Sequence, residues 1–291
     1  GIPTAKYETF DDPAKVMDYI RAEGKYPVVI KADGLALGKG VLICEDEQQA
    51  ADGVKEIMLD KKFGASGNHV VVEEFLTGPE VSVLSFTDGK VVKPMVSSMD
   101  HKRANDHDTG LNTGGMGTVA PNPYYTPAIA AECMEKIFLP TIKAMNAEGC
   151  PFKGCLYFGL MLTPDGPKVI EYNCRFGDPE TQVVLPLLEG DLLHIMQACT
   201  NGTLENEEVK FSDGAAACVI LASGGYPVAY EKGKPITGLV DGQLPGEENV
   251  TVYHSGTAIT EDGTLVTAGG RVLGVTATGP RLTNALSHAY E

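Results

Sequence analysis

Apolar residues in the first hundred positions follow two periods, one typical of amphipathic helices and one typical of short strands. Asp12 and Pro13 predict a helix start, because an aspartate cap and a proline in the first turn both favour one, and Gly24 predicts its end. Asp46 and Gln49 predict a second helix, capped by both side chains, that runs to about residue 59. Strand-like runs lie at 28–31, 41–44, 69–75, 80–86 and 90–96, the last two joined by an Asp-Gly turn.

The middle of the chain predicts a helix and a hairpin that follow a segment without periodicity. Residues 100–123 show neither period, and a loop of this length inside a compact domain is more often functional than idle. Residues 126–148 predict a helix interrupted at Pro140. Strands are expected at 154–163 and 168–173, paired through a Pro-Asp-Gly turn, with helical segments to about residue 200.

A charged stretch containing glycine, NGTLENEEVKFSDG, predicts a division of the chain into two domains. Residues 1–212 would form the larger domain, and residues 213–291 a small β-rich domain with strands near 215–222, 251–257 and 271–277. Residue 1 stands directly before the strand-like segment IPTAKY, and the last residues predict a helix that stops in mid-pattern. We therefore expect a fragment, truncated within its last domain.

Composition narrows the class of protein. The chain has 291 residues and a net charge of −16, so its surface repels nucleic acid and anionic membranes. Its apolar runs are all shorter than the roughly 18 residues that a membrane span needs. Seven cysteines without a CxxC pair argue against a zinc site or a disulfide framework and favour a reducing cytoplasm. Such a surface would also repel a nucleotide, so lysines set among glycines become candidates for a local anion site.

The segment from Lys31 to Gly40 combines a strand end with glycines and a second lysine. Gly34, Gly38 and Gly40 allow the backbone to approach an anion closely, and Lys31 and Lys39 could balance the charge of a triphosphate. The pattern is not a Walker loop, because it leads into a strand rather than a helix. The alternative is a flexible hairpin loop with two solvated lysines.

An acidic connector follows the strand at 69–75. Glu73, Glu74, Phe75 and Leu76 could present backbone groups to an adenine edge, and Glu80 could accept hydrogen bonds from ribose hydroxyls. The alternative is an exposed acidic turn between two strands.

Three polar side chains alternate along the strand that ends at 173. Glu171, Asn173 and Arg175 should share one face, since side chains alternate along a strand. Glu171 and Asn173 offer hard oxygen ligands suited to Mg²⁺, and Arg175 could neutralise a transferring phosphoryl group. The alternative is an edge strand with a wet face, against which the apolar lead-in and the Gly-Asp-Pro turn at Asp178 both count.

The aperiodic segment itself carries charges, small hydroxyls and glycines that suit a substrate-binding loop. Lys102 joins Arg175 and Asp178 as a candidate catalytic residue. The candidate substrate contacts are Asp108, Asn112, Thr113, Gly114 and Gly115. Either Asp108 or Asp178 could supply the anion that an ammonium group needs, and a close-fitting loop backbone could exclude larger substrates. Asn112, Thr113 and the amides of Gly114 and Gly115 could orient a second substrate without adding charge. The alternative is a mobile surface loop.

Taken in order, these segments resemble the ATP-grasp family, and within it the ligases that join glycine to 5-phosphoribosylamine. The resemblance rests on IKADGLALGKGV, VVEEFLTGPEVSV, DHKRANDHDTGLNTGGMG, VIEYNCRFGDPETQ, LASGGYP and GGRVLGVTA, which span nearly the whole chain. It implies an α+β fold in which two lobes clasp ATP, with a mobile lid lobe at about 24–88, followed by the small β-rich domain. It also implies the site roles given above, with ATP as co-substrate and Mg²⁺, or Mn²⁺, as the metal.

This sequence departs from the family pattern at two points. Many relatives carry another acidic metal ligand on the preceding strand, where this chain has Gly159, and they carry an N-terminal α/β domain that this sequence does not show. The implied reaction forms an acyl phosphate that an amine then attacks, so positioning and charge stabilisation dominate. Other ATP-grasp ligases or carboxylases, and a nucleotide-binding module without turnover, remain alternatives.

Overall fold

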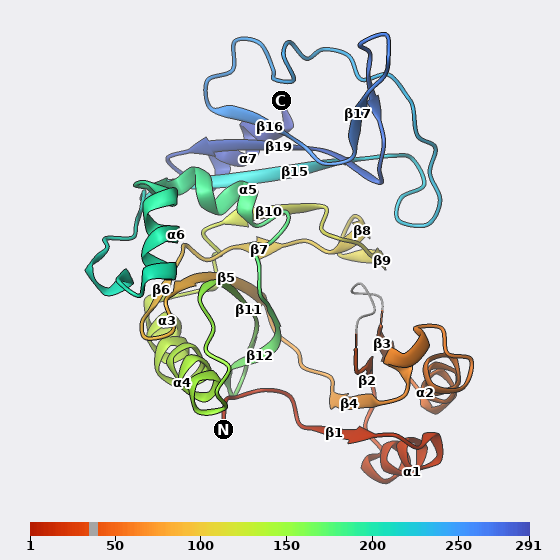
Figure 1. The fold of residues 1–291 in the computed structure, drawn as a ribbon. Coiled ribbons are helices and arrows are strands. Elements are labelled where there is room, and N and C mark those ends of the chain that lie inside the picture. The colour runs from red at the N-terminus through yellow and green to blue at the C-terminus, as the bar shows by residue number, and fades with distance from the viewer. Residues whose placement is uncertain (35–39) are drawn as a thin grey trace. The chain divides into compact units, whose positions relative to one another are not determined.

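The computed structural model describes residues 1–34 and 40–291, which form two compact units (Figure 1). One unit comprises residues 3–78, and the other comprises residues 79–291 together with residues 1–2. The predicted phosphate contacts Gly38 and Lys39 lie outside the described residues.

The unit of residues 3–78 is an antiparallel sheet with two helices. Its strand order is β1-β4-β2-β3. The bounds are β1 Tyr7–Phe10, α1 Pro13–Glu23, β2 Val28–Ala32, β3 Val41–Cys44, α2 Glu47–Val54 and β4 Val70–Glu74. Apolar side chains of both helices pack with those of the strands in one core, including Ile20, Ile30 and Ile57. The first strand begins at Tyr7, at the end of the strand-like IPTAKY segment.

The predicted helix caps are confirmed. The side chain of Asp12 accepts hydrogen bonds from the amides of Ala14 and Lys15, and Gly24 ends α1 in a left-handed conformation. At α2, Asp46 accepts from the Gln49 amide at 2.8 Å. A π-helical turn, Lys55–Leu59, carries this helix to the predicted end.

The larger unit contains a four-stranded antiparallel sheet of order β12-β11-β5-β6. A helical run packs on it, with the Phe138 and Phe158 ring centroids 4.4 Å apart (Figure 1). Its bounds are β5 Glu80–Thr87, β6 Val92–Pro94, α3 Pro127–Cys133, η3 Met134–Phe138, α4 Leu139–Ala147, β11 Gly154–Thr163 and β12 Gly166–Asn173. The interruption predicted at Pro140 takes the form of the π-helical turn η3, since proline has no N–H for the helical ladder.

A five-stranded sheet of order β16-β19-β15-β10-β7 completes this unit. The predicted domain boundary near residue 212 lies between β14 and β15, and β15 pairs antiparallel with β10 from the middle of the chain. The bounds are β7 Met99–Asp100, β10 Gly117–Ala120, α5 Thr181–Val184, η4 Leu185–Leu187, α6 Leu192–Asn201, β15 Ala215–Ala222, β16 Val250–His254, β19 Arg271–Gly279 and α7 Leu282–Tyr290. Short antiparallel ribbons add β8 Arg103–Asn105 with β9 Thr109–Asn112, β13 Leu188–Glu189 with β14 Lys210–Phe211, and β17 Thr257–Ile259 with β18 Leu265–Thr267.

The prediction of a loop without structure at 100–123 was wrong in part. The strands β8, β9 and β10 lie inside this range and β7 ends at its start. All four residues of β9 are exposed, so no apolar alternation marks that strand in the sequence.

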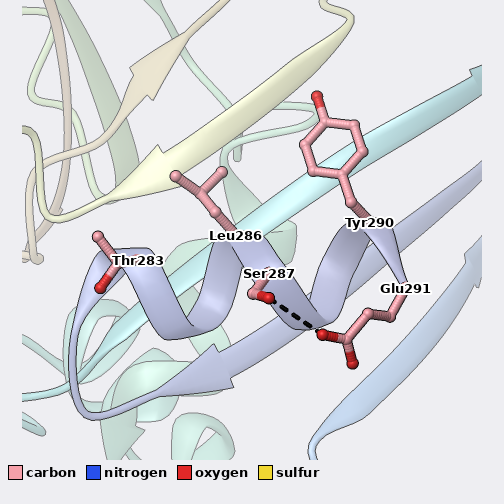
Figure 2. Close-up of a pocket in the computed structure, with 5 residues that line it drawn as sticks. All are labelled: Thr283, Leu286, Ser287, Tyr290 and Glu291. Carbon is pink, nitrogen blue, oxygen red and sulfur yellow. Dashed lines mark hydrogen bonds between the residues drawn. The ribbon is translucent and has the colours of Figure 1, made fainter.

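Two further features concern the helices. Of the helices in the described part of the chain, none has the length and apolar character that crossing a membrane requires. A hollow on α7 is lined by Thr283, Leu286, Ser287, Tyr290 and Glu291, and it contains none of the predicted site residues (Figure 2).

Candidate active site

The predicted site residues fall on both units. Lys31, Gly34, Gly40 and the connector Glu73 to Leu76 belong to the unit of residues 3–78, and the others in the described chain belong to the larger unit.

Lys31 forms an ion pair in the smaller unit. Its Nζ lies 2.7 Å from Oε2 of Glu73 on the adjacent strand β4, and each side chain is about one-fifth exposed. Lys31 is therefore held at the end of β2 by one of the carboxylates that the sequence predicts beside adenine. Glu74 accepts a hydrogen bond from the Lys6 amide at 2.9 Å, which fixes the end of β4.

Close packing explains the glycine at the start of the predicted phosphate loop. A side chain at Gly34 would place Cβ 2.6 Å from Ser66 Oγ. Gly40 is buried and accepts a hydrogen bond from the Ala32 amide at 2.8 Å, which closes the hairpin between β2 and β3. Phe75 and Leu76 follow β4 directly, and Phe75 is 38% exposed.

Lys102 is surrounded by carboxylates in the larger unit. Its Nζ lies 3.2 Å from Oε2 of Glu80 at the start of β5. Burial opposes its charge, but Glu80, Glu171 and Asp100 outweigh burial and raise the pKa of Lys102 above its usual value. Lys102 is thus a cation that pairs with Glu80 and is stabilised by the charge of Glu171.

Glu171 and Asn173 lie on one face of β12, as strand alternation predicts. Asn173 Nδ2 approaches Glu171 Oε1 at 3.4 Å. Gly159 lies opposite Glu171 on β11, and a Cβ there would come within 2.8 Å of Glu171 Cγ. The glycine therefore leaves room for the Glu171 side chain, which a second acidic residue at that position would not.

This donor pair fits a magnesium ion. Carboxylate and amide oxygens are hard ligands, and Mg²⁺ usually takes one or two from protein and the rest from water and phosphate. Within residues 1–34 and 40–291, no group of three or more His, Cys, Asp or Glu side chains is arranged to hold a metal ion. The pair alone would therefore leave most of the coordination shell to water and phosphate.

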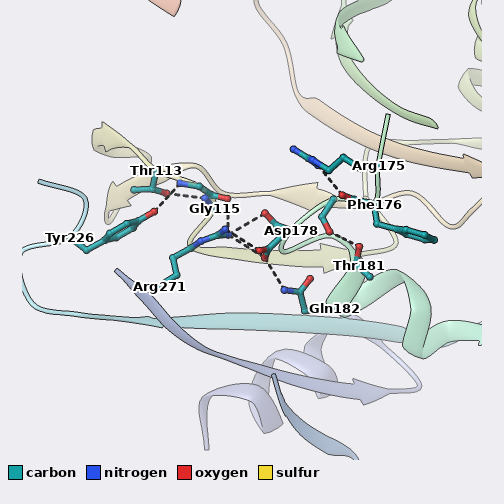
Figure 3. A network of polar contacts seen from close by, with 11 residues as sticks. Thr113, Gly115, Arg175, Phe176, Asp178, Thr181, Gln182, Tyr226 and Arg271 are labelled. Carbon is teal, nitrogen blue, oxygen red and sulfur yellow. Dashed lines mark hydrogen bonds and ion pairs between the residues drawn. The ribbon is translucent and has the colours of Figure 1, made fainter. Parts of the chain in front are cut away.

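Arg175 and Asp178 follow β12 but do different things. Arg175 is exposed and donates only to the adjacent Phe176 carbonyl among the bonds that the structure describes for it. Asp178 is bound on both carboxylate oxygens by Arg271, at 3.3 and 3.1 Å, and accepts from Gln182 at 2.8 Å (Figure 3). Arg175 is thus free to meet a ligand among the bonds described for it, whereas the charge of the Asp178 carboxylate is already balanced by Arg271.

The predicted substrate residues separate into two places. Thr113, Gly114 and Gly115 lie beside Asp178 and Arg271 (Figure 3). Asp108 lies at the exposed tip of the β8–β9 ribbon with a positive φ of 54°, and Asn112 is exposed at the base of that ribbon. The sequence offered Asp108 or Asp178 as the anion that binds the substrate ammonium group. In the structure Asp108 is an exposed turn residue, and Asp178 is paired with Arg271.

Sequence reasoning missed two acidic residues of the larger unit, Glu180 and Asp100. Glu180 is 4% exposed and accepts a hydrogen bond from Ser82 Oγ, which also lies 2.8 Å from the Tyr157 hydroxyl. Burial and the charges of Glu180 and Glu80 raise the pKa of Asp100 to about 7, against the opposing effect of Lys102. Oδ1 of Asp100 is buried and has no hydrogen-bond partner among the described residues. Asp100 lies in the motif DHKRANDHDTGLNTGGMG and Glu180 in VIEYNCRFGDPETQ, but neither motif indicates that a carboxylate is buried.

We expect Asp100→Asn to stabilise the protein at pH 8 by about 2 kcal/mol, because it removes a buried charge. The sign follows from the raised pKa: the neutral carboxyl favours the fold at low pH, and that contribution is lost as pH rises through about 7. Calorimetric unfolding at pH 5 and pH 8 measures the effect, with the exposed Asp165→Asn as control. A gain of equal size at both pH values would contradict it.

Comparisons with known proteins agree with this fold. The family model described as phosphoribosylglycinamide synthetase, ATP-grasp (A) domain, matches residues 1–181, and the model of the C domain matches residues 216–291. The chain is 46% identical to phosphoribosylamine–glycine ligase of Vibrio vulnificus over all 291 residues, which are 67% of that protein. It is 48% identical to the trifunctional purine biosynthetic protein adenosine-3 of Gallus gallus, of which it spans 28%.

Solved structures with a similar fold include a ligase of the same family. The crystal structure of phosphoribosylamine–glycine ligase from Thermotoga maritima superposes with a TM-score of 0.89 at 37% identity, and the match covers 100% of this chain and 71% of that one. The biotin carboxylase domain of 2-oxoglutarate carboxylase from Hydrogenobacter thermophilus superposes at 0.74 with 17% identity, covering 99% of this chain and 61% of that one. That second likeness shows the fold alone, which is the predicted ATP-grasp fold.

Proposed function

The chain belongs to the phosphoribosylglycinamide synthetase family, and from this premise we propose that it joins glycine to 5-phosphoribosylamine at the expense of ATP. The products are glycinamide ribonucleotide, ADP and phosphate, and the reaction is a step of purine biosynthesis. The observation that carries the proposal is the Glu171–Asn173 donor pair with the Lys102–Glu80 ion pair and the exposed Arg175 in the same unit.

The chemistry requires an activated carboxylate. An oxygen of the glycine carboxylate attacks the γ-phosphorus of ATP, the bond to the bridging oxygen breaks, and ADP leaves. The amine of 5-phosphoribosylamine then attacks the carbonyl carbon of the acyl phosphate. Phosphate departs with the C–O bonding electrons, and the new amide nitrogen loses a proton. None of these steps needs a nucleophilic side chain, so the protein positions substrates and stabilises charge.

The residues of the larger unit divide this work. Mg²⁺, or Mn²⁺, bound by Glu171 and Asn173 would supply positive charge at the phosphate oxygens. Arg175 neutralises the transferring phosphoryl group, and Lys102 provides a second fixed cation held by Glu80. Thr113, Gly114 and Gly115 face the small amino acid and exclude larger side chains.

The smaller unit supplies nucleotide contacts in this proposal. Lys31 and the glycines of residues 34–40 bind phosphate, the connector Glu73 to Leu76 binds adenine, and Glu80 of the larger unit accepts from ribose hydroxyls. Support comes from the position of Lys31, whose ion pair with Glu73 holds it near the end of β2, and from the exposure of Phe75 directly after β4. We also propose a reducing, cytoplasmic setting, which the seven free cysteines support.

The decisive experiment compares substrates. ADP release is measured with 5-phosphoribosylamine plus glycine, alanine, serine or bicarbonate. We expect release only with glycine. Release with bicarbonate instead would indicate an ATP-grasp carboxylase, and release with none of them would indicate a nucleotide-binding module without turnover.

Mg–ATP binding is tested independently of turnover. We expect Mg–ATP at 100 times its Kd to stabilise the chain by about 2.7 kcal/mol, because a ligand that binds only the folded state acts by mass action. A thermal-shift titration measures this, with ATP plus a chelator as the control. An unchanged melting temperature at millimolar Mg–ATP would argue against an intact nucleotide site.

A further inference from the structure

Two residues of the region matched by the C-domain model form hydrogen bonds with the amide and the carbonyl of Gly114. The Gly114 amide donates to the hydroxyl of Tyr226 at 3.0 Å, and its carbonyl accepts from Nη1 of Arg271 at 2.8 Å (Figure 3). Tyr226 follows β15, and Arg271 is the first residue of β19. A residue without a side chain is therefore fixed by its peptide groups alone.

The guanidinium of Arg271 is itself held in one orientation. It binds both carboxylate oxygens of Asp178, and Nη1 also donates to the Asp178 carbonyl at 3.1 Å. The Arg271 side chain is 19% exposed. A planar guanidinium that binds a carboxylate through two nitrogens has little freedom left, so its reach to Gly114 is fixed by Asp178.

Glycines on both sides make these contacts possible. A Cβ on Gly114 would lie 3.0 Å from the Arg271 guanidinium carbon, and a Cβ on Gly270 would lie 2.2 Å from the ring of Tyr226. The motifs LASGGYP and GGRVLGVTA thus meet in space, the first giving Tyr226 and the second giving Gly270 and Arg271.

The other side of the same segment is tied to Lys102. The amide and the hydroxyl of Thr113 both donate to the Lys102 carbonyl, at 2.7 and 2.8 Å, and the Gly115 amide donates to Thr113 Oγ1 at 3.0 Å. A shift of Gly114 would therefore disturb the backbone at Lys102. The segment connects the C-terminal strands to the candidate catalytic lysine.

We propose that Arg271 and Tyr226 are positioning residues that clamp Thr113–Gly115 in the conformation that recognises the amino-acid substrate. The proposal rests on the function given above. A Gly-Gly segment without these bonds would have many backbone conformations, and the substrate would have to order it on binding. Clamping removes that cost, so it strengthens binding of the amino acid and leaves binding of ATP unchanged.

The clamp itself is tested by hydrogen–deuterium exchange in the chain without ligands. Tyr226→Phe removes the acceptor of the Gly114 amide, and Arg271→Lys removes the planar fork. Both should speed exchange of peptides that contain Gly114 and Gly115 by at least about 10-fold, the size expected for loss of one net hydrogen bond of about 1.4 kcal/mol. Tyr230→Phe and Arg281→Lys are the matched controls, and equal exchange in variants and controls would overturn the clamp.

The functional part is tested by glycine binding, measured by titration calorimetry in the presence of Mg²⁺ and a non-hydrolysable ATP analogue. We expect the Kd for glycine to rise about 10-fold in Arg271→Lys and Tyr226→Phe, with the Kd of the analogue unchanged within about twofold. In turnover, KM for glycine should rise more than kcat falls. Gly114→Ala should act in the same direction, because its Cβ meets Arg271. Gly224→Ala should not, because a Cβ at Gly224 has no neighbour within 4 Å in the described part of the chain.

The outcomes separate the two proposals. Faster exchange with an unchanged Kd for glycine, or with equal weakening of the ATP analogue, would overturn the positioning role. Failure of the unsubstituted chain to bind glycine or to release ADP with it would overturn the proposed function, while the exchange data would still decide whether the clamp exists.

Discussion

Replacing Glu171 by glutamine should lower glycine-dependent ADP formation by about 100-fold or more at millimolar Mg²⁺. Glutamine keeps the shape of the side chain and removes its charge, so one of the two protein ligands becomes a weak neutral donor. Because Glu171 also raises the pKa of Lys102, its loss leaves that cation less balanced. The initial rate of ADP release as a function of Mg²⁺ concentration measures the effect.

Glu132→Gln is the control for that substitution. Glu132 pairs with Lys136 on the helical run and lies outside the site. The expected signature is a rate that recovers in part at high Mg²⁺ in Glu171→Gln while the control behaves as the unsubstituted chain does. Full activity of Glu171→Gln at ordinary Mg²⁺ would show that the metal ligands lie elsewhere.

Replacing Gly115 by alanine should lower the same rate by about 100-fold, the cost of misplacing a reacting group by about 1 Å. A Cβ at this position would lie 2.5 Å from Pro179 Cδ and 2.7 Å from Asp100 Oδ1, so the loop must move away from both. ATP binding should be unchanged, because the displaced segment belongs to the amino-acid end of the site. Steady-state kinetics with glycine and a thermal shift with Mg–ATP measure the two effects.

Gly154 offers a matched control for backbone strain. Its φ is 123°, close to the 113° of Gly115, but a Cβ there meets no atom of the described residues within 4 Å. Gly154→Ala therefore carries the strain of a positive φ without the collision. Equal losses of activity in the two variants would mean that strain alone, and not the contact with Asp100 and Pro179, explains the effect of Gly115→Ala.

Local signals in the sequence predicted most of the fold. The caps of Asp12 and Asp46 and the turn before β12 act over a few residues, so a pattern can specify them without knowledge of the rest of the chain. Strands β8 and β9 escaped prediction because exposed polar strands have no apolar alternation. These two strands pair through backbone hydrogen bonds, and the amino-acid composition of a segment does not indicate such bonds.

The site was predictable only where its geometry is local. Glu171 and Asn173 are two residues apart on one strand, and alternation places them together. Arg271 is separated from Asp178 by 93 residues, and no periodicity indicates such a pair. The raised pKa of Asp100 was hidden for a similar reason, because it depends on desolvation and on the charge of Glu180, which lies in another segment of the chain.

The five-stranded sheet has a consequence for dissecting this protein into parts. Strand β10 bonds to β7 on one edge and to β15 on the other, and the two regions matched by separate family models meet at the β10–β15 ladder. A gene divided between residues 181 and 216 would expose one edge of β10, with Val119 and Ala120, which are now buried, beside it. Unpaired edges of this kind recruit other chains, so the halves would be recovered as aggregates when made separately and as a soluble pair only when made together.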